Sequence, residues 1–596
     1  MLFVPRGPKR RFQLVLLKPS HYDDDGYIIH WARAYVPSNT LAVLYTLARD
    51  SAQRGVLGPD TAIDVTVVDE INSRINIKKL LAQFRRHDGF GLVMLAGVQS
   101  NQYPRALDIA RPFRAAGVPV IIGGFHVSGV LAMLPELTPE LKTTLDMGIS
   151  MFAGELEGRM DLLLQDAANG TMRPTYDYLK DLPSLESEPT PILPLAHLKR
   201  TIQHLATFDA GRGCPYQCSF CTIINVQGRK SRRRSADDVE KTIREHWAAG
   251  IRHFFITDDN FGRNKDWEAI FDRIIEMRER EKMNIRLMIQ VDTLCHKIPN
   301  FIEKAARAGT NRALIGVESI NAANLLNANK RQNKITEYRK MLLEWKKHGT
   351  ITIAGYILGF PFDSPESIRE DIKIIQNELP LDFPEFFCLT PLPGSQDHQT
   401  LYRKGEWMHE DLNLYDGEHA AANHAKMSKE EWEEIYRTAW TTYYSPEHVE
   451  TILRRGAAMN CSRSRMISLL FLSMTSVPIE NVHPLQGGML RRKYRLDRRP
   501  TMPVEPIWVF YPKYFWSFAK NSARELALAL WLIKTARRIY KDKNRYAYTD
   551  QALTPVTDDE TEKLELFTHS EAARESVKHV QKVAELTGAR TKASAA

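Results

Sequence analysis

Three cysteines within eight residues constrain this chain more than any other feature. Cys214, Cys218 and Cys221 are spaced C-x3-C-x2-C and follow an apolar segment at 205–210 that is predicted to be a buried strand. At this spacing each thiolate can bind one iron of a cubane iron–sulfur cluster, which leaves the fourth iron open to a small molecule. A structural zinc site would need a fourth cysteine or a histidine nearby. The remaining cysteines are isolated and are interpreted as buried apolar residues: Cys295, Cys388 and Cys461.

Short apolar strands alternate with amphipathic helices twice along the chain, which predicts two α/β units. The first, at 1–170, is expected to form a doubly wound parallel sheet. The second, at 199–397, predicts a partial (β/α)6 barrel, with active-site residues at the carboxyl ends of its strands. A proline-rich linker is expected between them at 171–198. Helices are expected at 398–570 and a flexible tail at 571–596.

The expected strands are of the kind that parallel sheets bury on both faces. In the first unit they lie at 13–17, 62–68, 91–95, 118–122 and 148–153. In the second unit they lie at 205–210, 253–257, 286–291, 312–317, 351–358 and 385–389. No strand is expected after 397.

The cysteine motif, placed after the first barrel strand and with Phe220 before its last cysteine, resembles the radical S-adenosylmethionine (SAM) superfamily. The resemblance covers about 200–395. It implies that Cys214, Cys218 and Cys221 hold a [4Fe-4S] cluster and serve as the catalytic cysteines. In that family the open iron chelates SAM, whose reductive cleavage gives a 5′-deoxyadenosyl radical that takes a hydrogen atom from the substrate.

Polar and glycine residues at later strand ends extend the same resemblance. Two carboxylates and an amide follow the second barrel strand, a carboxylate and a hydroxyl follow the fourth, and a glycine follows the fifth. Taken alone, a carboxylate at a strand end could equally be a helix cap. The residues that the resemblance implies for SAM binding are Phe220, Asp258, Asp259, Asn260, Glu318, Ser319 and Gly359.

The first unit resembles the cobalamin-binding domain that precedes the barrel in one radical SAM subclass. Glycines at its strand ends would let the backbone approach a bulky ligand closely. The residues implied for cobalamin are Gly97, Gly123, Gly124, Gly154 and Glu155. The segment at 18–23 lacks the Asp-x-His-x-x-Gly motif that ligates cobalt, and His126 follows the wrong strand and is interpreted as a turn residue. Cobalamin could therefore bind without a protein ligand, or the domain could have kept the fold and lost the cofactor.

Basic residues exceed acidic ones only mildly, 81 against 72 in 596 residues. The one dense basic run, at 229–234, is interpreted as a solvated loop or an anion contact near a cofactor, and no nucleic-acid partner is expected. We find no secretory signal, and the longest apolar run, 526–533, is too short to cross a bilayer. A cytoplasmic protein is expected. The aromatic segment at 508–516 predicts either a strap packed over the barrel or a peripheral contact with a membrane or a lipid-like substrate.

These features favour one enzymatic function and leave alternatives open. By family analogy, the protein would use SAM and cobalamin for C-methylation of a small-molecule or lipid-like substrate, with a flavodoxin- or ferredoxin-type protein as external one-electron donor. A radical cyclase or rearrangement enzyme on the same scaffold is the nearest alternative. A cobalamin- or metal-binding sensor without turnover belongs to another class, and a sensor has no need of a SAM site.

Overall fold

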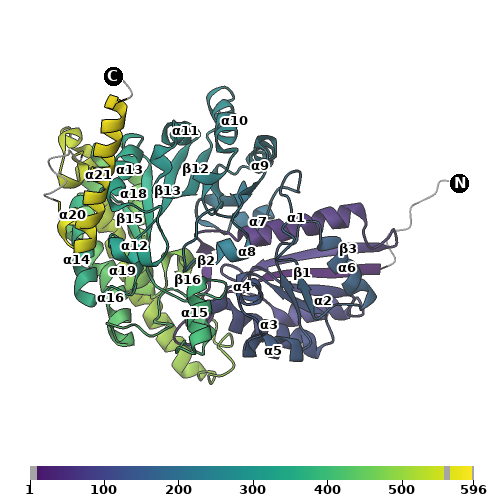
Figure 1. The fold of residues 1–596 in the computed structure, drawn as a ribbon. Coiled ribbons are helices and arrows are strands. Elements are labelled where there is room, and N and C mark those ends of the chain that lie inside the picture. The colour runs from purple at the N-terminus through teal and green to yellow at the C-terminus, as the bar shows by residue number, and fades with distance from the viewer. Residues whose placement is uncertain (1–9, 556–563, 594–596) are drawn as a thin grey trace.

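The computed structural model describes residues 10–555 and 564–593, which form an N-terminal α/β unit, a central open barrel and a C-terminal helical region (Figure 1). In Figure 1 the N-terminal unit lies at the right, and the barrel and the C-terminal helices lie beside it. The predicted fold class, two parallel α/β units followed by helices, is confirmed.

The N-terminal sheet is doubly wound. Its six parallel strands follow the order β3-β1-β4-β5-β6-β7. Alternate residues of β1 face opposite layers: Leu14 and Leu16 pack with α1 and α6, whereas Val15 and Leu17 pack with α2 and α3. The strands are β1 (Arg10–Lys18), β3 (Thr61–Asp69), β4 (Gly91–Leu95), β5 (Val120–Gly123), β6 (Ser150–Ala153) and β7 (Thr175–Asp177). The helices are α1 (Asn39–Arg54), α2 (Ile77–Arg85), α3 (Tyr103–Ala115), α4 (Phe125–Met133), α5 (Pro139–Asp146) and α6 (Met160–Asn169).

The central unit is an open barrel, because its sheet runs β15-β14-β13-β12-β11-β8 and its two edge strands do not pair. All neighbouring strands are parallel, so their carboxyl ends form one rim. The strands are β8 (Leu205–Phe208), β11 (His253–Ile256), β12 (Arg286–Val291), β13 (Thr310–Glu318), β14 (Ile351–Leu358) and β15 (Phe383–Cys388). The covering helices include α9 (Ala236–Ala248), α10 (Trp267–Glu279), α11 (Phe301–Arg307), α12 (Ala322–Asn327), α13 (Ile335–Lys347) and α14 (Pro365–Glu378).

The C-terminal region contains α16 (Lys429–Tyr443), α17 (Pro446–Ala458), α18 (Arg463–Glu480) and the 35-residue α19 (Ile507–Lys541). The helix α16 packs on β15 and α14, and α19 packs on α17 and α18. Among the described residues, no helix combines the length and the apolarity needed to cross a bilayer.

Three segments differ from the prediction. The expected linker contributes β7, which extends the first sheet by pairing with β6. A strand lies beyond 397, because β16 (Gly488–Arg491) pairs with β2 (Trp31–Ala34) and ties the C-terminal region to the first unit. The expected flexible tail forms α21 (Glu571–Ala593), since Ala573 and Val577, one turn apart, are buried against the rest of the fold. Residues 594–596 of that tail lie outside the described residues.

Candidate cofactor sites

The three motif cysteines share one loop between β9 (Gly211–Arg212) and α8 (Ile223–Val226). Backbone hydrogen bonds hold this loop: the Cys214 N–H donates to the Gly228 carbonyl at 3.2 Å, and the Cys221 N–H donates to the Cys218 carbonyl at 3.2 Å. The Cys218 thiol is buried, and its sulfur accepts a hydrogen bond from the Gln332 amide at 3.4 Å. The loop therefore presents three free thiols together at the carboxyl end of the first barrel strand.

The thiols fit an iron–sulfur cluster better than a single ion. Among the described residues, no three His, Cys, Asp or Glu side chains converge as the ligands of one metal ion would. Ligands of a cubane cluster bind separate irons and stand farther apart. Burial, with the neighbouring Cys218 and Cys214 adding to it, raises the pKa of the Cys221 thiol to about 12. Thiolates crowded in a buried site need a compensating positive charge, which iron would supply.

The polar residues after β11 support the cysteine loop. Asp258 accepts hydrogen bonds from the N–H groups of Ala210 and Gly211 at 2.7 and 2.8 Å and from the Asn264 amide at 3.0 Å. Asp259 accepts one from the Gly213 N–H at 3.1 Å. Burial raises the pKa of Asp258 to about 7 and that of Asp259 to about 6. These bonds give both carboxylates a role in holding the loop, and their contact with SAM stays a prediction.

Asp292 is a site residue that the sequence interpretation missed. It directly follows β12, and it accepts hydrogen bonds from the Asn260 amide at 3.0 Å and the Tyr216 hydroxyl at 3.1 Å. It also forms an ion pair with Arg263 at 2.6 Å. Burial opposes ionisation, but Arg263 and Asn260 hold the pKa of Asp292 below its usual value. Since Tyr216 belongs to the cysteine motif, Asp292 links three elements around the loop.

Glu318 ends β13 and folds back over the barrel rim, with φ at +63°. It forms an ion pair with the buried Lys330. A Cβ on Gly316 would lie 2.6 Å from Oε1 of Glu318, so the carboxylate lies directly over this glycine. Burial lowers the pKa of Lys330, but Glu318 and Cys218 together raise it above its usual value. The sequence predicted Glu318 for this site but not Lys330.

The other residues expected near SAM differ in their surroundings. The Phe220 ring lies 6.0 Å from the Phe360 ring in an edge-on arrangement and 5.5 Å from Nζ of Lys330. The Ser319 hydroxyl accepts a hydrogen bond from the N–H of Asn321, the residue that caps α12, at 3.0 Å. A Cβ on Gly359 would lie only 2.0 Å from the indole of Trp432, so this glycine serves packing.

The residues expected to bind cobalamin line one cavity at the carboxyl edge of the first sheet. They are Gly97, Gly123, Gly124, Gly154 and Glu155. Three residues that flank the cysteine loop also line this cavity: Arg212, Val226 and Gln227. A Cβ on Gly124 would overlap the Val98 backbone at 2.1 Å. The cavity therefore borders the cysteine loop.

Glu155 does more than line this cavity. Its carboxylate forms ion pairs with Arg212 at 2.6 Å and with Arg232, and Arg212 also pairs with Glu157 at 2.6 Å. His126, by contrast, is a buried residue of α4, and its ring nitrogens contact the Ser100 hydroxyl at 3.0 Å and Glu140 at 3.3 Å. It does not line the cavity, so the structure supplies no histidine there for cobalt.

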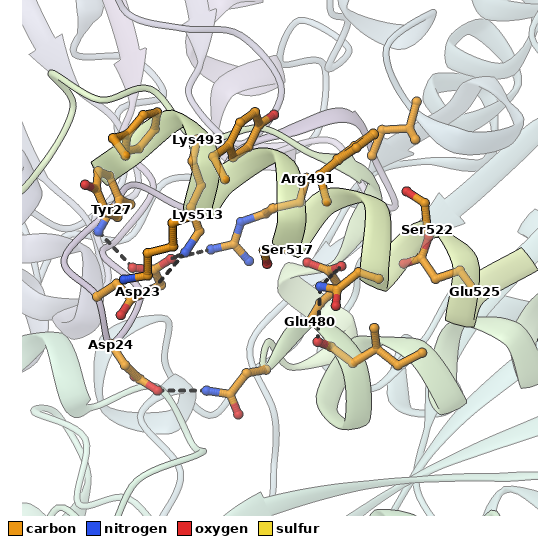
Figure 2. A pocket seen from close by; sticks show the side chains of 18 of the residues that line it. Asp23, Asp24, Tyr27, Glu480, Arg491, Lys493, Lys513, Ser517, Ser522 and Glu525 are labelled. Atoms are coloured by element: carbon orange, nitrogen blue, oxygen red, sulfur yellow. Dashed lines mark hydrogen bonds and ion pairs between the residues drawn. The ribbon is translucent and has the colours of Figure 1, made fainter. Parts of the chain in front are cut away.

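A separate pocket of about 330 Å³ lies against α19 (Figure 2). Its polar contacts are internal: Arg491 pairs with Asp23 at 3.0 Å, and Asn481 donates to Asp24 at 2.7 Å. This pocket shares no lining residue with the cavity at the first sheet.

Comparison with known proteins decides the family. Residues 210–375 match the radical SAM superfamily model. The bacteriochlorophyllide d C-12(1)-methyltransferase of Chlorobaculum tepidum is 30% identical over 53% of this chain and 67% of its own length. The chain belongs to the radical SAM superfamily. It is an enzyme of this superfamily, which uses a [4Fe-4S] cluster and SAM, and a doubly wound parallel sheet precedes its barrel.

Other radical SAM relatives and structures agree in sequence and fold. The bacteriochlorophyllide d C-8(2)-methyltransferase of the same organism is 27% identical over 54% of this chain and 72% of its own length. The hopanoid C-2 methylase of Rhodopseudomonas palustris is 25% identical over 51% of this chain and 56% of its own length. TsrM from Kitasatospora setae, solved with cobalamin and a [4Fe-4S] cluster, shares the fold over 66% of this chain and 78% of its own, at 15% identity and a TM-score of 0.50. OxsB, solved with aqua-cobalamin and SAM, shares it over 96% of this chain and 83% of its own, at 14% identity and a TM-score of 0.51.

Proposed function

We propose that this enzyme transfers a methyl group to a carbon atom of a small-molecule or lipid-like substrate. The observation that carries the proposal is the shared wall: residues around the cysteine loop line the cavity at the edge of the first sheet. A methyl group held at that cavity and a substrate radical formed at the cluster would then lie on the same side of both sheets. The relatives named above are methyltransferases of bacteriochlorophyllide d and a methylase of hopanoids, which supports this outcome.

The protein's own residues would hold and separate the reactants. When bound, the [4Fe-4S] cluster with SAM would supply a hydrogen-abstracting radical, and cobalamin in the cavity at the first sheet would supply a transferable methyl group. We assign Cys214, Cys218 and Cys221 as the cluster ligands and the Glu318–Lys330 pair as the polar contact beside the open iron. Phe220 and Phe360 would form an aromatic wall that excludes water from the radical. Asp258, Asp259 and Asp292 would fix the loop that carries the thiols, because each one bonds to a residue within or next to it.

Product analysis tests this proposal. The reconstituted and reduced enzyme should convert SAM to 5′-deoxyadenosine through radical formation and to S-adenosylhomocysteine through methyl donation. Formation of 5′-deoxyadenosine alone would favour the radical cyclase or rearrangement alternative. Absence of both products would contradict the enzymatic function and favour the sensor.

We further propose that the enzyme meets a membrane through the aromatic half of α19. Trp508 and Trp516 expose 78% and 74% of their surface, which argues against a strap packed on the barrel. The exposed apolar side chains continue along the helix at Phe515, Leu526 and Leu530. They recur at helical spacing and so share one face. The other face of the helix lines the pocket in Figure 2.

The charge of α19 suits an anionic bilayer. The helix has a single acidic residue, Glu525. Its basic residues are Lys513, Lys520, Arg524, Lys534, Arg537, Arg538 and Lys541. A long helix with tryptophans on one side and lysines and arginines beside them lies flat in a lipid interface. Such a contact would give the enzyme access to a lipid-like substrate.

A reductant must also reach the cluster. The described cysteines outside the motif are dispersed and buried, so they offer no second cluster to relay electrons. We propose that an external protein of the flavodoxin or ferredoxin type donates the electron.

A further inference from the structure

The basic run at 229–234 divides into two groups in the structure. Arg232 pairs with Glu155, Arg233 pairs with Asp266 at 2.5 Å, and the buried Arg234 donates to the Asp209 carbonyl at 3.0 Å. These three arginines are used in holding the fold. Arg229 and Lys230 are exposed, and among the described residues no carboxylate forms an ion pair with either of them.

Arg229 and Lys230, the two cations without a carboxylate partner among the described residues, lie beside the cysteine loop. The Cys214 N–H donates to the carbonyl of Gly228, the residue before Arg229. A Cβ on Gly213 would lie 2.6 Å from the carbonyl oxygen of Lys230, so the two backbones touch. The guanidinium of Arg229 lies 3.0 Å from the side-chain amide group of Gln217, inside the cysteine motif.

We propose that Arg229 and Lys230 form the docking surface for an acidic protein that delivers one electron to the cluster. The proposal rests on the proposed function, which needs a reduced cluster. One electron leaves the carrier, which is oxidised by one unit, and enters the cluster, which is reduced by one unit, with no group transferred. Electron transfer slows steeply with distance, so the carrier must bind where the cluster loop meets solvent. Unpaired cations at that place attract and orient an acidic partner.

Two other occupants fit this surface less well. Val226 and Gln227 line the cavity assigned to cobalamin, but Arg229 and Lys230 do not. A nucleic acid would need a wider basic surface, and the next three arginines of the run are already paired.

The test compares two reductants on the reconstituted full-length enzyme. The double variant Arg229→Glu/Lys230→Glu should lower the second-order rate constant for cluster reduction by reduced flavodoxin, a small acidic protein, by about tenfold or more at low salt. High salt should abolish most of this difference, because it screens exposed charges. SAM cleavage driven by dithionite should stay at the wild-type rate. Arg85→Glu/Arg86→Glu is the matched control, since it reverses two exposed charges at the C-terminal end of α2, and it should leave both rates unchanged.

The outcomes separate this proposal from the proposed function. An unchanged rate with flavodoxin would overturn the docking surface, and so would an equal loss in the control. Loss of cobalt from the double variant would also overturn it, by placing the two cations in cofactor binding. Failure of the wild type to cleave SAM with dithionite would contradict the proposed function itself.

Discussion

Glu155 and Arg212 form a buried ion pair, 2.6 Å between Oε2 and Nη1, that joins the first sheet to the cysteine loop. Arg212 lies two residues before Cys214, and Glu155 follows β6. One carboxylate thus fixes the position of the cobalamin cavity relative to the cluster ligands. The pair also connects stability to function, because breaking it leaves a buried charge and loosens the contact between two cofactor sites.

Replacing Glu155 by Gln should weaken this junction. Arg212 keeps Glu157 as a partner, but Arg232 loses its only described carboxylate. Removing one member of a buried pair costs about 3 kcal/mol, so we expect a loss of that order in the free energy of unfolding, with lower cobalt retention. Denaturant titration and cobalt analysis measure the two effects. The exposed Glu186→Gln is the control, and an unchanged stability of Glu155→Gln would contradict the role of the pair.

Replacing Cys218 by Ala should remove the cluster. The variant should lose the visible absorbance of iron and sulfide and all SAM cleavage, because only three thiolates are available as ligands. Cys461→Ala, at a buried cysteine far along the chain, should keep both properties. A Cys218→Ala enzyme that still cleaves SAM would show that the ligand assignment is wrong.

Replacing Lys330 by Met should impair SAM binding without loss of iron. Glu318 would lose its ion-pair partner at the barrel rim, and its carboxylate would turn toward other contacts. We expect the KM for SAM to rise by about tenfold, which corresponds to 1.4 kcal/mol, while the cluster absorbance stays. The neighbouring exposed Arg331→Met should have no effect. Equal KM values for Lys330→Met and the wild type would exclude the pair from SAM binding.

The half-buried Glu385 of β15 should make stability depend on pH. Burial raises its pKa to about 7. Since the pKa of Glu385 is higher in the folded than in the unfolded protein, its contribution to the free energy of unfolding is complete below about pH 4.5 and is lost as the pH rises through about 7. The loss is at most about 3 kcal/mol. Glu385→Gln should therefore be more stable than the wild type at pH 8 and gain less at pH 5. Unfolding curves at both pH values measure this, and parallel pH profiles for variant and wild type would contradict it.

The double variant Trp508→Glu/Trp516→Glu should lose binding to vesicles. Wild-type enzyme should sediment with vesicles that contain phosphatidylglycerol and much less with pure phosphatidylcholine, because α19 is both apolar and basic. We expect the variant to bind at least about tenfold more weakly, since two large apolar anchors are replaced by charges. Leu326→Glu, at another exposed apolar residue, should bind like the wild type. Equal sedimentation of all three proteins would exclude α19 as the contact.

The parts of the site that follow from local sequence were predictable. The cysteine spacing identifies a cluster loop without any knowledge of packing. The glycines of the first unit could be placed together because parallel strands end at one sheet edge, and Gly97, Gly123 and Gly154 do line one cavity. Strand positions could also be predicted, because parallel sheets bury short apolar runs on both faces.

The rest depends on contacts between distant segments. Lys330 meets Glu318 only because the chain returns over the rim after α12, and no local pattern marks it. The pairing of β2 with β16 joins four-residue strands from opposite ends of the chain. Asp258 and Asp259 were placed at the correct strand end, but their partners in the cysteine loop decide what they do. The aromatic composition of α19 predicted either a packed strap or a membrane contact, and only the fold shows which side of the helix is exposed.

The most direct test of the central claim is metal analysis after anaerobic reconstitution with iron, sulfide and hydroxocobalamin, followed by desalting. The account predicts about four irons and one cobalt per chain, with the absorbance of both cofactors. Four irons without cobalt would contradict the cobalamin-dependent methyl transfer and leave the radical SAM site. If the protein retained neither iron nor cobalt, the assignment of both sites would be contradicted.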